Sequence, residues 1–305
     1  MAAWRAVVRV LRSREFRSQT LRSPLDAVGC TLFPSRCRVC NEPLLHLSFC
    51  PVCLACLENL PPQNDSLCTL CGESLGPSAP FRRLEAAQAV SLCEICIRLR
   101  PGFTQAVAHG LYEGTLRTLI HLLKYERVTP LAKPLGALLA QSVQQMVQAH
   151  PDFPNDVAVV VVPLHPSKEK QRGFNQTALL AEAAVPVLAR ADKLRRWKLV
   201  SGAMSRRRVT ESQSGLTSHQ RRRNLRGAFF VKRPEMIAGR AVLLLDDIYT
   251  TGATAGECTR TLLAAGAEKV FVATVARSQR EGVAHWDWMP PTTPRTEPSA
   301  RAISF

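Results

Sequence analysis

Cysteine pairs constrain this chain more than any other feature. Ten of its eleven cysteines lie before residue 97, and eight of them form four Cys-x-x-Cys pairs. A two-residue gap lets both sulfurs of a pair face one ion from a tight turn, and two such pairs complete a tetrahedral thiolate site. The spacing therefore predicts two structural zinc ions in a small module of zinc-ribbon type. The expected ligands are Cys37, Cys40, Cys50, Cys53, Cys68, Cys71, Cys93 and Cys96.

Other uses of these cysteines fit the sequence less well. Disulfides need an oxidising compartment, and we expect no secretion signal because Arg5, Arg9 and Arg12 interrupt every apolar run near the start of the sequence. Iron–sulfur ligation is possible, but paired spacing with turn residues is more typical of zinc. Sequential pairing gives the shorter loops. Cys56 offers an alternative pair with Cys53, and Cys30 is spare.

Length and charge suggest two domains and an anionic partner. The 305 residues exceed one typical domain, and the cysteine-rich composition ends near residue 100. We expect a flexible basic extension at 1–22, the zinc module at 23–100, a larger domain at 101–278 and a flexible tail at 279–305. Of the net charge of +16, most lies in 190–233, which holds fourteen Lys and Arg against two acidic residues. No apolar run is long enough to span a bilayer.

The larger domain is predicted to be α/β with a parallel sheet. Residues 104–150 have mainly helical spacing of apolar residues, and after Pro154 strands and helices alternate. Strands are expected at 157–162, 240–245 and 269–276. Helices are expected at 177–189, where Pro186 limits the helix, and at 254–265, where Gly266 follows as a helix stop.

The most informative segment is residues 242–254, Val-Leu-Leu-Leu-Asp-Asp-Ile-Tyr-Thr-Thr-Gly-Ala-Thr. A buried strand ends in Asp246 and Asp247, whose carboxylates can accept hydrogen bonds from ribose hydroxyls. The loop that follows, with a helix N-terminus behind it, can surround a phosphate. Gly252 permits the close backbone approach that such a loop needs. An ATPase magnesium strand would also end in Asp-Asp, but it requires a Gly-Lys phosphate loop, and no glycine here precedes lysine.

This segment resembles the binding signature of type I phosphoribosyltransferases for 5-phosphoribosyl diphosphate (PRPP). The resemblance implies that Asp246 and Asp247 bind the ribose hydroxyls and that Mg²⁺ accompanies the diphosphate. It also implies a 5′-phosphate site made by Thr250, Thr251, Gly252, Ala253 and Thr254.

A wider set of motifs resembles the ComF family, over about residues 24–277. The motifs are Tyr-Glu-Gly at 112–114, Lys-Tyr at 124–125, Val-Val-Pro-Leu-His at 161–165, Arg-Gly-Phe-Asn-Gln at 172–176, Gln-Ser-Gly-Leu at 213–216 and Arg-Arg-Arg-Asn at 221–224. Members combine a zinc ribbon with a phosphoribosyltransferase domain and are named for DNA uptake during natural competence. By resemblance, the turn at 163–167 would take the place of the diphosphate loop, and 193–226 would form a hood over the diphosphate.

Two functions remain open at this stage. The first is a cytoplasmic phosphoribosyltransferase that joins the C1 of PRPP, or of a related phosphorylated ribose, to an unassigned nitrogen acceptor, with no residue assigned as catalytic base. The second is a factor in DNA uptake that binds single-stranded DNA or a DNA-handling protein, with PRPP as a regulator or with no catalysis. Aromatic residues make up only 6% of the chain, and Trp197 is the single aromatic residue within 193–226, so base stacking there is poorly supported. The sequence carries no signal for an oligomeric state.

Overall fold

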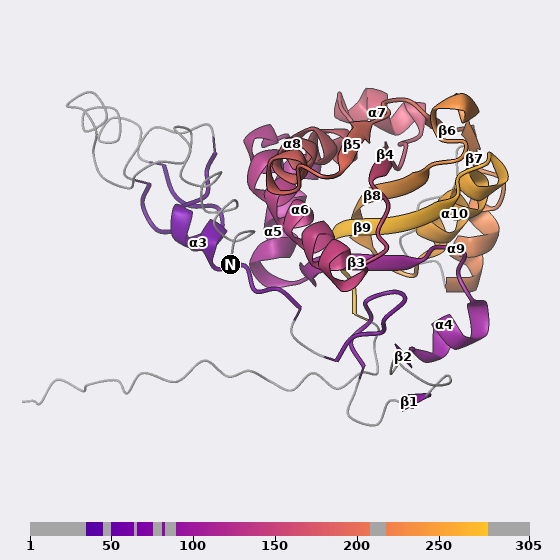
Figure 1. Ribbon diagram of the computed structural model, residues 1–305. Coiled ribbons are helices and arrows are strands. Elements are labelled where there is room, and N and C mark those ends of the chain that lie inside the picture. Colours follow the sequence, from indigo (N-terminus) through magenta and orange to yellow (C-terminus); the bar gives the residue numbers. More distant parts are fainter. Residues whose placement is uncertain are drawn as a thin grey trace, which may run out of the picture.

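A computed structural model of the chain describes residues 35–44, 50–63, 66–75, 81–82, 90–207 and 218–279. The expected extension at 1–22 and, except for Gln279, the expected tail lie outside these residues. Figure 1 shows a central sheet with helices on both faces and the cysteine-rich segments at its margins.

A five-stranded sheet, parallel throughout, forms the centre of the molecule. Its strand order is β3-β9-β8-β4-β5, with every neighbouring pair parallel. All five strands therefore end at one edge, where ligands bind in open parallel sheets. The strands are β3 (Gln105–Leu111), β4 (Asp156–Val161), β5 (Arg196–Leu199), β8 (Ala241–Tyr249) and β9 (Lys269–Arg277).

Helices cover both faces of this sheet. On one face lie α5 (Gly114–Tyr125), α6 (Ala132–Ala149) and α8 (Gln176–Ala191), and on the other lies α10 (Ala253–Ala264). Shorter helical elements are α3 (Leu54–Glu58), α4 (Glu94–Leu99), η1 (Thr129–Leu131), α7 (Pro166–Arg172), α9 (Ser218–Leu225) and η2 (Pro234–Met236). A two-stranded unit, β6 (Met204–Arg206) with β7 (Phe229–Val231), joins α9 beside the sheet, and we refer to these three elements as the hood. A second pair of short strands, β1 (Phe81–Arg82) and β2 (Val90–Ser91), lies in the cysteine-rich region.

Alternation along the strands divides the interior into two cores. In β8, Leu243 and Leu245 face the core under α5, α6 and α8, whereas Val242 and Leu244 face the core under α10. The cysteine-rich segments join these cores separately. Cys37, Cys53 and their neighbours pack on the first core, and the cysteines from Cys68 to Cys96 pack on the second.

The expected α/β class with a parallel sheet is confirmed, and two local predictions are wrong. Residues 105–111 form the edge strand β3, although helix was expected there, because pairing with β9 overrides a weakly patterned sequence. Pro186 does not limit its helix but lies inside α8. Among the described residues, no helix combines the length and the hydropathy needed to cross a membrane.

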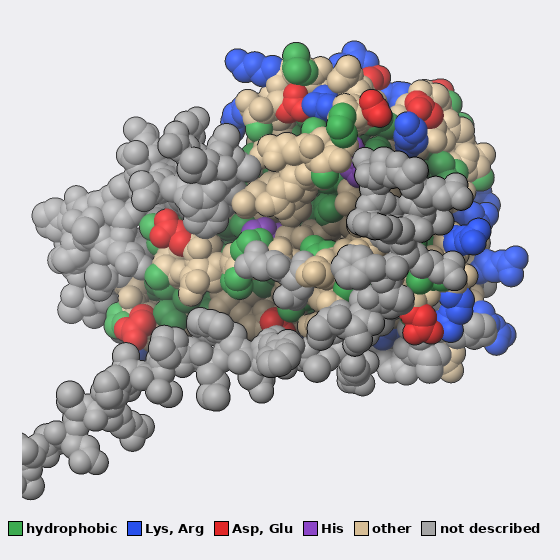
Figure 2. All heavy atoms as spheres, turned by 60° about the horizontal axis from the view of Figure 1, so that its bottom comes forward, with side chains coloured by type: hydrophobic (Ala, Val, Ile, Leu, Met, Phe, Trp, Pro, Cys, Tyr) green, Lys and Arg blue, Asp and Glu red, His purple; other side chains and the backbone are tan. Residues whose placement is uncertain are grey.

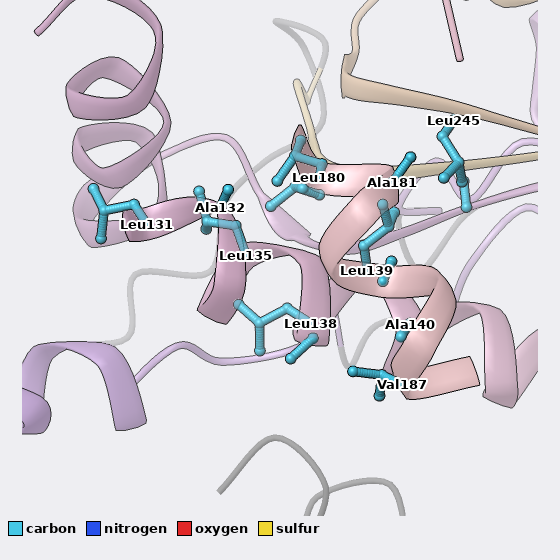
Figure 3. Close-up of a cluster of buried hydrophobic side chains, with 14 of the residues drawn as sticks. Leu131, Ala132, Leu135, Leu138, Leu139, Ala140, Leu180, Ala181, Val187 and Leu245 are labelled. Atoms are coloured by element: carbon cyan, nitrogen blue, oxygen red, sulfur yellow. The ribbon is translucent and has the colours of Figure 1, made fainter. Parts of the chain in front are cut away.

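The contact between α6 and α8 in the first core depends on a glycine. Figure 3 shows Leu135, Leu138 and Leu139 of α6 beside Leu180 and Ala181 of α8. Gly136 lies at this crossing, where an added Cβ would stand 2.6 Å from the Ala183 Cβ. The missing side chain therefore lets the two helices pack against each other.

We predict that Gly136→Ala lowers the free energy of unfolding by about 1–3 kcal/mol, because the new methyl group forces α6 away from α8. The matched control is Gly256→Ala in α10, where an added Cβ meets nothing within 4 Å. That control should be neutral or stabilising by up to about 1 kcal/mol. Urea unfolding measures both, and equal stability of the two variants would contradict the packing argument.

Candidate ligand site and cysteine tetrads

Eight cysteines gather into two groups of four. One group is Cys37, Cys40, Cys53 and Cys56, the other is Cys68, Cys71, Cys93 and Cys96, and within each the sulfurs lie within 4.8 Å of one another. The Cys40–Cys53 and Cys71–Cys93 sulfurs are each 3.7 Å apart. Ligands of a tetrahedral zinc site at 2.3 Å would stand about 3.8 Å apart, so the spacing suits this ion. Disulfides would need about 2.05 Å.

The two groups are built as a repeat. Each begins with a Cys-x-x-Cys turn closed by an amide-to-carbonyl bond, from Cys37 to Glu42 and from Cys68 to Glu73. Each turn holds a residue with positive φ, Asn41 in the first and Gly72 in the second. The second pair of each group then starts a short helix. Cys53 precedes α3 and Cys93 precedes α4, with nearly identical backbone angles.

The prediction of Cys50 as a ligand needs correction. Cys56 completes the first group because it lies on the first turn of α3, three residues after Cys53, as Cys96 does on α4. Cys50 precedes this turn and is buried outside the group. The repeat could have shown this in the sequence. Aligning residues 37–44 with 68–75 and then Cys53 with Cys93 matches Cys56 to Cys96 and leaves Cys50 opposite Val90.

A buried arginine joins the second cysteine group to the sheet edge. Arg277, at the end of β9, is 1% exposed and donates hydrogen bonds to the Cys71 carbonyl and to the Glu73 carboxylate. Its guanidinium also lies over the ring of Tyr249, with 4.4 Å from Cζ to the ring centroid. Tyr249 is the last residue of β8, just before the candidate phosphate loop.

The loop between β8 and α10 surrounds a small pocket. Gly252 adopts φ of +75° directly before α10, and an added Cβ would stand 2.2 Å from the Tyr249 hydroxyl oxygen. Any other residue would therefore displace Tyr249 or the loop. Asp246, Thr250, Gly252 and Thr254 line the pocket, whereas Asp247, Thr251 and Ala253 do not. Hydroxyls, a positive-φ glycine and a helix N-terminus at one place can hold a phosphate.

Asp247 points to the opposite face of the sheet, into a network of ion pairs and hydrogen bonds. Its Oδ2 atom lies 2.9 Å from Lys124 Nζ and accepts a 2.8 Å bond from Gln176 Nε2. The Gln176 Oε1 atom in turn accepts from Arg172 at 2.9 Å, and the Arg172 guanidinium lies over the ring of Tyr125. Burial alone would lower the pKa of Lys124, but Asp247 beside it raises the pKa above its ordinary value. The Lys-Tyr motif at 124–125 and the Arg-Gly-Phe-Asn-Gln motif at 172–176 therefore both meet the carboxylate of Asp247, although the three lie far apart in the sequence.

Asp246 is in a different electrostatic environment from Asp247. Burial, and then the negative charge of Asp247, raise its pKa to about 7, against lowering contributions that include Lys124 and Arg206. The Asp246 Oδ1 atom accepts the backbone amide of Asp247 at 2.8 Å. Close to neutral pH this carboxyl can therefore change its protonation state.

Cations from two further elements lie near the carboxylates. The pKa of Lys168, on α7, lies below its ordinary value because of burial and then because of the charges of Arg206 and Arg172. Arg206, at the end of β6, also interacts electrostatically with Asp246. Figure 2 shows more Lys and Arg side chains on the right, the side on which the hood lies in Figure 1. Exposed hood-side cations are Arg207, Arg223, Arg226, Lys232 and Arg233.

Two residues near the expected diphosphate turn act as helix caps. His165 Nδ1 accepts the amide of Ser167 at the start of α7, and the Asn175 side chain accepts the amide of Thr177 at the start of α8.

The basic segment, residues 190–233, does not form one continuous surface. Arg196 lies in β5 and pairs with Asp156 at the amino edge of the sheet, and Trp197 is buried.

The fold defines the class of this chain as a parallel-sheet α/β protein, preceded by two four-cysteine groups. Curated relatives match most of the chain. The chain is 32% identical over 248 residues to DNA utilization protein YhgH of Salmonella typhi, covering 80% of this chain and 98% of the relative. It is 28% identical over 233 residues to competence protein F of Haemophilus influenzae, covering 74% and 96%. The chain belongs to the ComF family, to which its motifs are similar.

A further relative and a solved structure match the chain at lower identity. Competence protein ComFC of Bacillus subtilis is 27% identical over 228 residues, covering 74% of this chain and 84% of the relative. No family model matches the sequence. A solved structure described as the allosteric regulatory enzyme of purine biosynthesis is 18% identical and covers 48% of this chain and 26% of its own. Its TM-score of 0.27 is too low to support an argument.

The corrected first tetrad gives a direct test with matched variants. We predict that Cys56→Ala lowers the zinc content by about one ion per chain, whereas Cys50→Ala leaves it unchanged, because only Cys56 shares the first group. Metal analysis of protein purified under reducing conditions measures both. Loss of zinc from Cys50→Ala with retention in Cys56→Ala would reverse the assignment.

The raised pKa of Asp246 predicts a pH-dependent cost to stability. An ordinary aspartate ionises near pH 4, so between about pH 4 and pH 7 the unfolded state releases this proton before the folded state does. The contribution of Asp246 to the free energy of unfolding should therefore fall as pH rises through this window, by an amount on the order of 2 kcal/mol. The Asp246→Asn variant has no titratable carboxyl group at this position. Urea unfolding of the parent and of this variant at pH 5 and pH 8 therefore isolates the contribution of Asp246 to the pH dependence of stability. An equal pH dependence in both proteins would contradict it.

Proposed function

We propose that the chain binds PRPP, or a closely related phosphorylated ribose, at the end of β8. One observation carries the proposal: Gly252, held at positive φ against Tyr249, places Thr250 and Thr254 around a pocket at the start of α10. The 5′-phosphate would lie in this pocket, with Thr251 and Ala253 contributing to the same loop. Asp246 and Asp247 would accept hydrogen bonds from the ribose hydroxyls.

The diphosphate would lie toward Lys168, Arg172 and Arg206. These cations come from α7 and the hood, and their mutual repulsion in the free protein favours an anion between them. Mg²⁺ would accompany the diphosphate and neutralise part of its charge when bound. Arg206 is held partly in place by the ring of Phe229, 5.5 Å from its Cζ.

The reaction that fits this site is transfer of the phosphoribosyl group to a nitrogen acceptor with loss of diphosphate. Such chemistry develops positive charge on the sugar, so positioning and electrostatics can carry most of it. Carboxylates close to the ribose would stabilise that charge. The proposal assigns no general base.

Two zinc ions would be structural and held by the two four-cysteine groups. All four positions of each group are thiolates, which leaves no open coordination position for chemistry. Thiolate sites of this kind persist where thiols stay reduced, which supports a cytoplasmic location.

Handling of single-stranded DNA is the second candidate function. The names of the relatives, DNA utilization protein and competence protein, favour it. Exposed cations on the hood side also suit a nucleic-acid backbone. Under this proposal PRPP is a substrate or a regulator at the same sheet edge.

The phosphate pocket is tested with Thr254→Val, which keeps the shape of the side chain but removes its hydroxyl. We expect this variant to bind PRPP with Mg²⁺ about tenfold more weakly, because one hydrogen bond to a charged group is lost. Thr254→Ser retains the hydroxyl and should bind within about threefold of the parent. Isothermal calorimetry measures both. Equal affinity of all three proteins would place the phosphate elsewhere, and no binding by the parent would reject the PRPP proposal.

A further inference from the structure

The solvent face of α5 carries an aromatic and cationic stripe that the PRPP site does not use. Arg117, His121 and Tyr125 follow one another at four-residue spacing, which places them on one face of the helix. The opposite face holds the buried leucines of the first core. Tyr112, just before the helix, joins the same stripe through a 2.7 Å hydrogen bond between its hydroxyl and His121 Nε2. We call Tyr112, His121 and Tyr125 the aromatic stripe.

The rings of the stripe are close to one another. The Tyr112 and His121 rings are stacked, with centroids 6.1 Å apart and planes 29° apart, and the His121 and Tyr125 centroids are 5.2 Å apart. Burial and the charges of Arg117 and Lys124 lower the pKa of His121, so its ring is neutral at physiological pH. The stripe is therefore a row of uncharged rings.

A guanidinium stands at each end of this row. Arg117 lies over the Tyr112 ring with 5.9 Å from Cζ to the centroid, and Arg172 lies over the Tyr125 ring at 5.2 Å. A row of rings flanked by guanidiniums can hold single-stranded nucleic acid, by base stacking on the rings and by phosphate contacts with the cations.

Most of the Tyr125 side chain is exposed to solvent and does not pack against the protein. It is 63% exposed, and among the described residues the other exposed large hydrophobic side chains are the aliphatic Leu99 and Leu194. If Tyr125 had a structural role alone, its contact with His121, four residues earlier on the helix, would be sufficient. The exposed ring is instead available to an external planar group.

The stripe is also continuous with the cations of the ligand site. Arg172 contacts Tyr125 and, through Gln176, the ribose carboxylate Asp247. Lys168 lies within the electrostatic reach of both Arg172 and Arg206 of the hood. A cationic path therefore runs from the hood across α7 to the aromatic stripe.

We propose that the aromatic stripe of α5 is a stacking platform for the bases of single-stranded nucleic acid, with Arg117 and Arg172 contacting the flanking phosphates. This inference rests on the proposed DNA-handling function and assigns it to an element outside the basic hood. An open helix face favours unpaired bases, since the bases of a duplex are already stacked on one another. The strand would then pass beside the ribose carboxylates.

The test compares two oligonucleotides of equal length and charge, one of thymidine and one of abasic units, by fluorescence anisotropy at low salt. The parent protein should prefer the thymidine strand by about tenfold, because stacking contributes roughly 1–3 kcal/mol per base. Tyr125→Ala should lose this preference while still binding the abasic strand as the parent does. Tyr125→Trp, which restores a large ring, should retain the preference.

Leu194→Ala is the matched control, because Leu194 is 85% exposed but lies before β5 at the amino edge of the sheet. It should bind both strands as the parent does. A Tyr125→Ala variant with an unchanged preference would overturn the platform and leave DNA handling in place, as would a parent protein that binds both strands equally. No binding of either strand by the parent would overturn both proposals.

Discussion

The buried guanidinium of Arg277 links the two halves of this molecule. It is withdrawn from water, which is costly for a charge, and it is stabilised there by the Cys71 carbonyl, the Glu73 carboxylate and the Tyr249 ring. Cys71 and Glu73 belong to the second cysteine group, whereas Tyr249 ends β8 and Arg277 itself ends β9. Removing any partner would leave a buried charge incompletely paired, so the contacts hold as a group.

The consequence of this link reaches the ligand loop. Tyr249 is fixed on one side by Arg277, and its hydroxyl lies so close to Gly252 that only glycine fits there. The backbone conformation of the phosphate pocket therefore depends on the ring, and the ring depends on the second cysteine group. The second cysteine group can in this way influence the shape of the loop between β8 and α10 through Arg277 and Tyr249.

Much of the sheet and the loop could be predicted from sequence because their signals are local. The apolar run before Asp246, the Thr-Thr-Gly turn and the helix that follows lie within one short segment. The strand β3 was missed because its residues, Gln-Ala-Val-Ala-His-Gly-Leu, hold one β-branched side chain and no clear alternation. Its conformation is decided by β9, far away in the chain.

The wrong prediction of Cys50 in place of Cys56 has the same kind of cause. Spacing alone allows either cysteine to pair with Cys53, and the choice depends on α3, which carries the second ligand of the pair on its first turn. Loop length favoured neither residue. Comparison of the two halves of the cysteine-rich region distinguishes them, because Cys56 matches Cys96 whereas Cys50 stands opposite Val90.

The convergence on Asp247 could not be read from any single motif. Lys124, Arg172 and Gln176 come from three helices and meet at the end of β8 only when the sheet is formed. The result is two adjacent carboxylates in unlike surroundings. Asp247 is held in an ion pair, whereas Asp246 lines the candidate phosphate pocket with a pKa raised to about 7. Neighbouring groups separated in this way can take separate roles, one a fixed acceptor and the other a group that exchanges a proton as a ligand arrives.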